Sequence, residues 1–155
     1  FEYLEEVYPN PPLLPTIMAE RVEARRFSSW FDDTFHQEVT SKLLYQRVYR
    51  QLSDSDHADS SLMKSGMVAL KAHINYLDRI LEERRWLAGD SMTIADFAAA
   101  SHFSSLDYIG DIDWNGFDSI KNWYAKIKSR PAFRSLLTDY LPTFMPSKHY
   151  ADLDF

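Results

Sequence analysis

The chain has 155 residues, a length typical of one domain, and 45% of them are hydrophobic, which is enough for a packed core. Its 17 basic and 23 acidic side chains give a net charge of −6, which argues against a general nucleic-acid-binding protein, and no run of about 20 apolar residues would span a membrane. The lack of cysteine excludes a disulfide framework and a thiol nucleophile. Together with an acidic N-terminus unlike a signal peptide, it fits a cytoplasmic protein.

Apolar residues recur at helical spacing along the whole chain, so we expect an all-α fold. A short first helix from Phe1 to about Tyr8 precedes a stiff linker, in which prolines prevent a helix from continuing. Thr16 is a candidate N-cap for a long second helix that reaches Leu52, allowing for a bend. The apolar positions assigned to this helix are Ile17, Met18, Val22, Phe27, Trp30, Phe31, Phe35, Val39, Leu43, Leu44, Val48, Tyr49 and Leu52.

Four further helices are expected after residues 53–61, a segment rich in Asp and Ser that we interpret as a loop. The third helix is expected to turn Leu62, Met63, Val68, Leu70, Ile74, Leu77, Ile80 and Leu81 inward. The fourth begins at Thr93 and ends before Gly110, and the fifth runs from about Phe117 to Ser129. Pro131 suits the first turn of a sixth helix, and an extended tail follows Pro142.

The segment Trp86–Asp96 contains the pattern of a helix start. The Thr93 hydroxyl can accept a hydrogen bond from the backbone N–H of Asp96, and the Asp96 carboxylate can accept one from the N–H of Thr93, as in a capping box. Met92 and Phe97 occupy the two positions of a hydrophobic staple. We favour this structural role for Thr93 and Asp96 over a role of Asp96 as a general base.

The segment Trp86–Asp96 resembles the start of the central buried helix in the C-terminal domain of the glutathione S-transferase superfamily. Residues 123–133 resemble the late helix pair of that domain. Residues 1–15 resemble the last helix of the thioredoxin-like N-terminal domain and the linker after it. The resemblance implies a C-terminal-type helical bundle at residues 16–141 and an extended tail at residues 142–155.

The same resemblance implies that half of the family architecture is missing, which fits a chain that starts at Phe1 rather than Met. In these enzymes the thiol-activating residue and most glutathione contacts come from the thioredoxin-like half. We therefore expect no catalytic residue and no cofactor here, with glutathione bound only when the missing half is present. The intact protein is expected to be a homodimer.

In glutathione transferases the helical half also lines the site for the electrophilic co-substrate. On that resemblance, Trp30, Phe31, Phe103 and Tyr108 are candidate lining residues, although a place in the core explains such aromatic side chains equally simply.

Metal and hydrolase motifs are not evident in the sequence. Asp32, Asp33 and His36 lie one helical turn apart, but a solvated helix face explains them better than a metal site does, so we expect no metal. No HExxH, CxxC or glycine-rich phosphate loop occurs, and no motif indicates a Ser-His-Asp triad.

The tail ends on interleaved aromatic, apolar and acidic residues: Tyr150, Asp152, Leu153, Asp154 and Phe155. It is either packed on the missing half or offered to a partner as a short peptide, and the exposed apolar end favours the partner.

With residues 105–114, the tail resembles a narrower family, the glutathione-transferase-like cell-division proteins of alphaproteobacteria. Members bind the tubulin homologue FtsZ, and their tail is implicated in signalling toward septal wall synthesis. This resemblance implies a non-catalytic regulator that binds FtsZ and septal division proteins. The alternatives are a transferase that conjugates glutathione to a hydrophobic electrophile, and a plain dimerisation domain.

Overall fold

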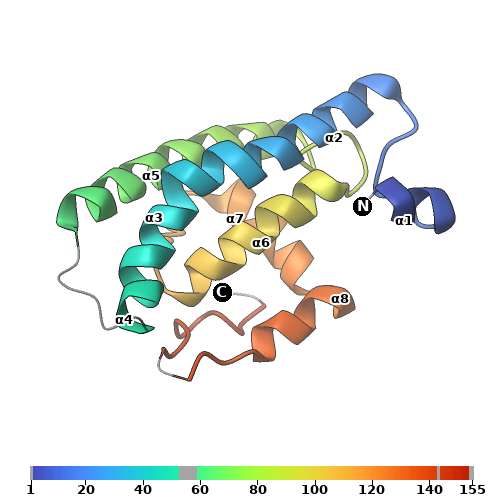
Figure 1. The fold of residues 1–155 in the computed structure, drawn as a ribbon. Coiled ribbons are helices and arrows are strands. Elements are labelled where there is room, and N and C mark those ends of the chain that lie inside the picture. Colours follow the sequence, from blue (N-terminus) through green and yellow to red (C-terminus); the bar gives the residue numbers. More distant parts are fainter. Residues whose placement is uncertain (1, 53–58, 143, 154–155) are drawn as a thin grey trace.

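A computed structural model of the chain describes residues 2–52, 59–142 and 144–153, and within them every regular element is a helix (Figure 1). The all-α prediction is therefore confirmed. The elements are α1 (Glu2–Val7), α2 (Met18–Trp30), η1 (Phe31–Thr40), α3 (Ser41–Leu44), η2 (Tyr45–Tyr49), α4 (Arg50–Leu52), α5 (Ser60–Glu83), α6 (Ile94–Tyr108), α7 (Asp118–Lys128), α8 (Pro131–Arg134) and η3 (Ser135–Thr138). Helix α6 packs against α2, η1, α3 and α7, and α1 lies apart at one end of the molecule.

The second predicted helix is continuous from α2 to α4, but η1 and η2 are π-helical stretches within it. Phe27, Phe31, Phe35, Val39 and Leu43 are spaced by four residues and are all fully buried. On an α-helix each step of four residues rotates a side chain by about 40° around the axis, so this stripe would leave the core. The wider π-helical turns offset that rotation, which keeps the stripe on one face, and the helix changes direction between α2 and α3, as the allowance for a bend anticipated (Figure 1).

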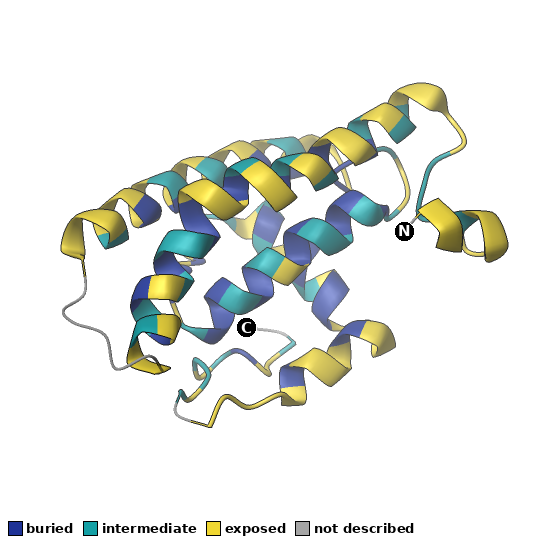
Figure 2. Cartoon of the chain, in the orientation of Figure 1, coloured by how far each residue is buried: buried dark blue, intermediate teal, exposed yellow. Residues whose placement is uncertain are grey.

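The start of this helix differs from the prediction. The N-cap is Ile17, with no side-chain cap, so the prediction of Thr16 as the cap was wrong. Ile17, Met18 and Val22 are exposed, and Figure 2 shows the first turns of α2 mostly in the colour of exposed residues. The apolar residues at the start of α2 are therefore not covered by the rest of this domain.

Helix α5 begins at a different kind of cap, because the side chain of Asp59 accepts hydrogen bonds from the N–H groups of Ser61 and Leu62. Residues 53–58 of the expected loop lie outside the described residues. The inward positions Leu70, Ile74, Leu77 and Leu81 are buried as predicted, and Met63 and Ile80 are partly buried. Leu62 and Val68, by contrast, are exposed, so those two assignments were wrong.

The helix start at Thr93 is confirmed, and both halves of the capping box are present. Thr93 accepts a hydrogen bond from the N–H of Ala95 at 3.2 Å, and Asp96 accepts one from the N–H of Thr93 at 2.8 Å. Asp96 also accepts hydrogen bonds from the N–H of Leu87 at 3.0 Å and from Nε1 of Trp123 at 2.8 Å. Burial raises the pKa of Asp96, while these hydrogen bonds act in the opposite direction. The carboxylate thus joins the turn, α6 and α7, which is a structural role.

The late helices follow the prediction, with Pro131 in the first turn of α8. The segment after Pro142 is less extended than expected, because it folds back in turns against α6 and α7 (Figure 1). Its contacts with α6 form the candidate site.

Candidate functional site

A groove with a volume of about 450 Å³ lies between the end of the second helix, the C-terminal half of α6 and the segment after α8. Apolar and hydroxyl-bearing side chains line it: Leu44, Val48, Tyr49, Leu52, Ser101, Ser104, Ser105, Tyr108, Ile109, Leu136, Asp139, Tyr140, Leu141 and Tyr150. Such a lining suits an apolar molecule or side chain. Tyr150 of the C-terminal segment and Tyr108 of α6, two residues predicted to belong to a site, both line this groove.

The four residues predicted to line an electrophile site do not meet in one cavity. Phe31 and Phe103 are fully buried, with ring centroids 6.3 Å apart, and belong to the core. Trp30 packs edge-on against Phe31 at 5.0 Å and also against His73 and Tyr76 of α5, so it extends the same aromatic core cluster. Of the four, Tyr108 alone lines the groove.

Tyr108 fixes the segment after η3 at three points. Its hydroxyl donates a hydrogen bond to the carbonyl of Phe144 at 2.7 Å and accepts one from the N–H of Leu141 at 3.0 Å. Its backbone carbonyl accepts a hydrogen bond from the N–H of Ser147 at 2.8 Å. Leu141, Phe144 and Ser147 are therefore held at defined positions along the end of α6.

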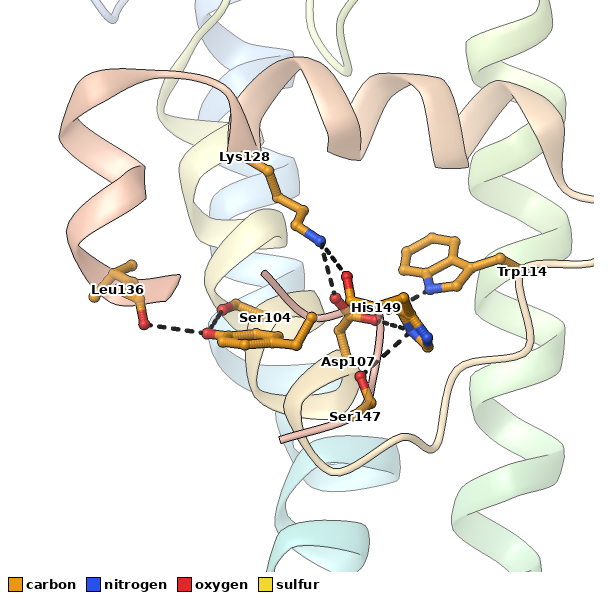
Figure 3. Close-up of polar contacts among 8 residues, drawn as sticks. Ser104, Asp107, Trp114, Lys128, Leu136, Ser147 and His149 are labelled. Carbon is orange, nitrogen blue, oxygen red and sulfur yellow. Dashed lines mark hydrogen bonds and ion pairs between the residues drawn. The ribbon is translucent and has the colours of Figure 1, made fainter. Parts of the chain in front are cut away.

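Asp107, the neighbouring residue on α6, gathers a second set of contacts in the interior (Figure 3). Its carboxylate lies 2.8 Å from Nε2 of His149, 3.1 Å from Nε1 of Trp114 and 3.5 Å from Nζ of Lys128. Lys128 also donates a hydrogen bond to the carbonyl of His149 at 3.3 Å. One buried carboxylate thus connects α6, α7, the loop at Trp114 and the C-terminal segment.

Burial governs the electrostatics of this cluster, because Asp107 and Lys128 are both 0% exposed. Burial lowers the pKa of Lys128, whereas the nearby charge of Asp107 acts to raise it. Burial also raises the pKa of Tyr124, and the charge of Asp107 adds to this effect. A charge this deeply buried is tolerated only where an opposite charge and hydrogen bonds compensate it.

Ser147, His149 and Asp107 lie within reach of one another, but they do not form a hydrolytic triad. The same atom, Nε2 of His149, faces both Oδ1 of Asp107 at 2.8 Å and Oγ of Ser147 at 3.5 Å. A triad requires the two ring nitrogens to serve the acid and the nucleophile separately. An Nε2–H that donates to Asp107 has no lone pair for the serine proton, so this cluster is an anchor for the tail.

The predicted partner-binding residues of the tail differ in burial, because Tyr150 is part of this anchor and the residues after it are not. Tyr150 is only 4% exposed, and its hydroxyl lies 2.9 Å from Oγ of Ser104, so it belongs to the anchor and is not presented to solvent. Asp152 is exposed and Leu153 is partly buried. Asp154 and Phe155 lie outside the described residues, and the role of the tail stays a prediction.

Sequence reasoning missed the cluster around Asp107. One sequence signal could have indicated it. Asp107 lies between the apolar Leu106 and the aromatic Tyr108 in a predicted buried helix, and a buried acidic residue needs a partner for its charge. The partners Lys128 and His149 are 21 and 42 residues away, and no local pattern links them.

Neither a cluster of metal ligands nor a membrane-spanning helix is found among the described residues. Among the described residues, no three His, Asp or Glu side chains gather as metal ligands would, and Asp33 instead bonds to Gln37. Across the described helices, none combines the length and apolar character that a membrane span requires.

The class of protein follows from this fold and from a family comparison. The family model "Glutathione S-transferase, C-terminal domain" matches residues 44–139, and the chain belongs to that family. The capping box at the start of the buried helix α6 is the feature that had indicated this family.

Particular relatives narrow the assignment. The chain is 46% identical over 154 residues to FtsZ-localized protein A of Caulobacter vibrioides, which covers 99% of this chain and 68% of that protein. The solved structure of FzlA from C. crescentus superposes with a TM-score of 0.96, at 45% identity, over 99% of this chain and 68% of that chain. A protein described as a glutathione S-transferase from Rhodospirillum rubrum F11 gives a TM-score of 0.94 at 45% identity, over 99% and 69% of the two chains. The chain is an FzlA-like protein of the glutathione S-transferase superfamily.

Proposed function

We propose that this chain is the helical part of a non-catalytic, cytoplasmic regulator of bacterial cell division that binds FtsZ and forms a homodimer. The observation that carries the proposal is the 46% identity to FtsZ-localized protein A along nearly the whole chain. The anchored tail supports it, because a buried carboxylate that fixes the route of a C-terminal segment suits a protein that presents this segment to a partner.

Co-sedimentation tests the FtsZ interaction directly. The intact protein that contains this chain is mixed with FtsZ polymers and centrifuged, and we expect it to enter the pellet only when FtsZ is polymerised. A protein that stays in the supernatant over the whole accessible concentration range would contradict the proposal.

The tail is proposed to contact a septal partner rather than FtsZ itself. Deletion of residues 151–155, which follow the buried Tyr150, is expected to leave co-sedimentation with FtsZ intact and to abolish rescue of division in cells that lack the protein. Lys148→Ala serves as the matched control, because Lys148 is exposed in the same segment and precedes the deletion. Normal division with the deleted protein would exclude this role of the tail.

A transferase that conjugates glutathione to a hydrophobic electrophile is the second candidate. The groove favours it, because it is apolar, holds about 450 Å³ and includes Tyr108 from the residues expected to line an electrophile site. Glutathione would then be bound by a thioredoxin-like half. Turnover of glutathione with a hydrophobic electrophile by the intact protein would favour this candidate over the first.

A further inference from the structure

The groove has an electrostatic character that is not evident from its apolar lining. Two buried tyrosines, Tyr108 and Tyr150, are in edge-to-face contact at 5.0 Å. Two exposed tyrosines, Tyr49 and Tyr140, also line the groove. Aromatic ring faces are electron-rich and attract cations.

The hydroxyl groups of the lining add to this character because their hydrogens are already used. Four of them donate to backbone carbonyl groups at distances of 2.7–3.4 Å: Ser101 to Ala98, Ser105 to Ser101, Tyr108 to Phe144 and Tyr150 to Leu136. What these groups still offer to a ligand is oxygen lone pairs. At these four positions the wall can accept hydrogen bonds from a ligand rather than donate them.

The charge in the lining has the same sign. Asp139 is the one ionisable acid among the lining residues, no Lys, Arg or His is among them, and no ion pair is recorded for Asp139 within the described part of the chain. Asp139 itself lines the groove. Burial raises the pKa of Tyr150, and the charges of Asp107 and then Asp139 add to this effect. Negative charge, lone pairs and ring faces together complement a cation with apolar substituents.

The same residues hold the tail. Tyr150 lines the groove and is itself part of the C-terminal segment, and Tyr108 lines the groove and bonds to Leu141 and Phe144. A ligand that packs against both tyrosines is bound more tightly when the segment is docked. By linkage, such a ligand stabilises the docked segment by the same factor.

We infer that the groove binds a small organic ammonium ion, and that this ligand holds the C-terminal segment against α6. The ligand would thereby regulate how the end of the tail is presented. This regulatory meaning rests on the proposed function, whereas the assays below contain no FtsZ, so their failure is distinguishable from a failure of that proposal.

A titration of the intact protein tests the ligand class. The probe is 2-phenylethylammonium, and 2-phenylethanol is its neutral counterpart of the same shape. We expect saturable binding of the ammonium, weakened about 3- to 10-fold by Asp139→Asn and by Tyr49→Leu. Tyr45→Leu is the matched control, because Tyr45 is similarly exposed (51% against 59% for Tyr49) on the same helical segment but does not line the groove.

Three results would overturn the inference about the ligand. They are equal affinity for 2-phenylethanol, an equal loss of affinity in Tyr45→Leu, and no saturable binding of the ammonium at concentrations up to about 10 mM.

Limited trypsin digestion tests the link to the tail. Lys148 is exposed between Ser147 and His149, both of which contact α6, so cleavage after Lys148 reports undocking of the segment. We expect saturating 2-phenylethylammonium to slow this cleavage several-fold while cleavage after Lys64 on α5 keeps its rate. In Tyr49→Leu the ratio of rates with and without the ligand should return toward one. An unchanged rate after Lys148 with the ligand bound would refute the coupling.

Discussion

Asp107→Asn is the perturbation that probes the buried anchor most cleanly. Asparagine has nearly the same shape and keeps an oxygen that can accept hydrogen bonds from Trp114 and His149. The substitution removes the negative charge 3.5 Å from Lys128, whose side chain is 0% exposed. The main consequence is therefore a buried ammonium group that has lost its carboxylate.

The expected cost follows from two independent arguments. Removal of one partner of a buried ion pair typically costs about 3–5 kcal/mol. Lys128 could instead lose its proton, and for a lysine with an ordinary pKa of about 10.4 this costs about 4.6 kcal/mol at pH 7, which sets an upper limit. We expect the free energy of unfolding to fall by about 3–4.5 kcal/mol.

Urea denaturation of the intact protein at pH 7 measures this loss, and Asp107→Asn/Lys128→Met is the matched double variant. Because the double variant removes both charges, we expect it to recover most of the stability that the single variant loses. A loss below about 1 kcal/mol in Asp107→Asn, or a double variant as unstable as the single one, would refute the role of the ion pair.

The pH dependence gives a further check on the same variant. Loss of the Asp107 charge removes the influence that acts to raise the pKa of Lys128, so this pKa falls further below that of an unfolded lysine. Between the two values the unfolded chain binds more protons, and stability rises with pH. The deficit of Asp107→Asn should therefore shrink from pH 7 toward pH 10, and a constant deficit would contradict this explanation.

Three other variants test the helical core. Asp96→Ala leaves four buried donors without their acceptor and should lower the free energy of unfolding by about 3 kcal/mol or more in urea, whereas a loss under about 1 kcal/mol would argue against the role of the capping carboxylate. Gly66→Ala places a Cβ atom 3.0 Å from the fully buried side chain of Leu43, so despite the better helix propensity we expect a net loss of about 1 kcal/mol, and a higher melting temperature would disprove this close approach. Burial, and then the charge of His36, lower the pKa of His102, so the unfolded chain binds more protons below about pH 6.5 and stability falls as the pH drops. His102→Gln should therefore show a smaller fall in melting temperature between pH 7 and pH 5, and an equal fall would exclude His102 as a source.

The fold could be predicted from the sequence because its main signals are local. The apolar spacing places the helices, and the helix start at Thr93 depends on residues only three positions apart. The start of α2 was less predictable, since Thr16 has the right side chain for a cap but the helix begins one residue later. Burial of Leu62 and Val68 was wrongly predicted because periodicity alone does not tell which part of a face a neighbouring helix covers.

The site was harder to predict because it depends on contacts between distant parts of the chain. Asp107 bonds to His149 across 42 residues, and Tyr150 joins the groove only because the tail folds back. Phe31 and Phe103 are of a residue type that often lines binding sites, yet both side chains are fully buried in the core. Residue type alone does not separate these two outcomes, whereas burial does.

The central claim is that the protein carrying this chain is an FtsZ-binding division regulator rather than a glutathione-dependent enzyme. The most direct measurement is a side-by-side titration of the intact protein with polymerised FtsZ and with glutathione. The account predicts saturable binding to FtsZ polymers, and only millimolar or undetectable binding of glutathione. Tight binding of glutathione together with no binding to FtsZ would contradict it.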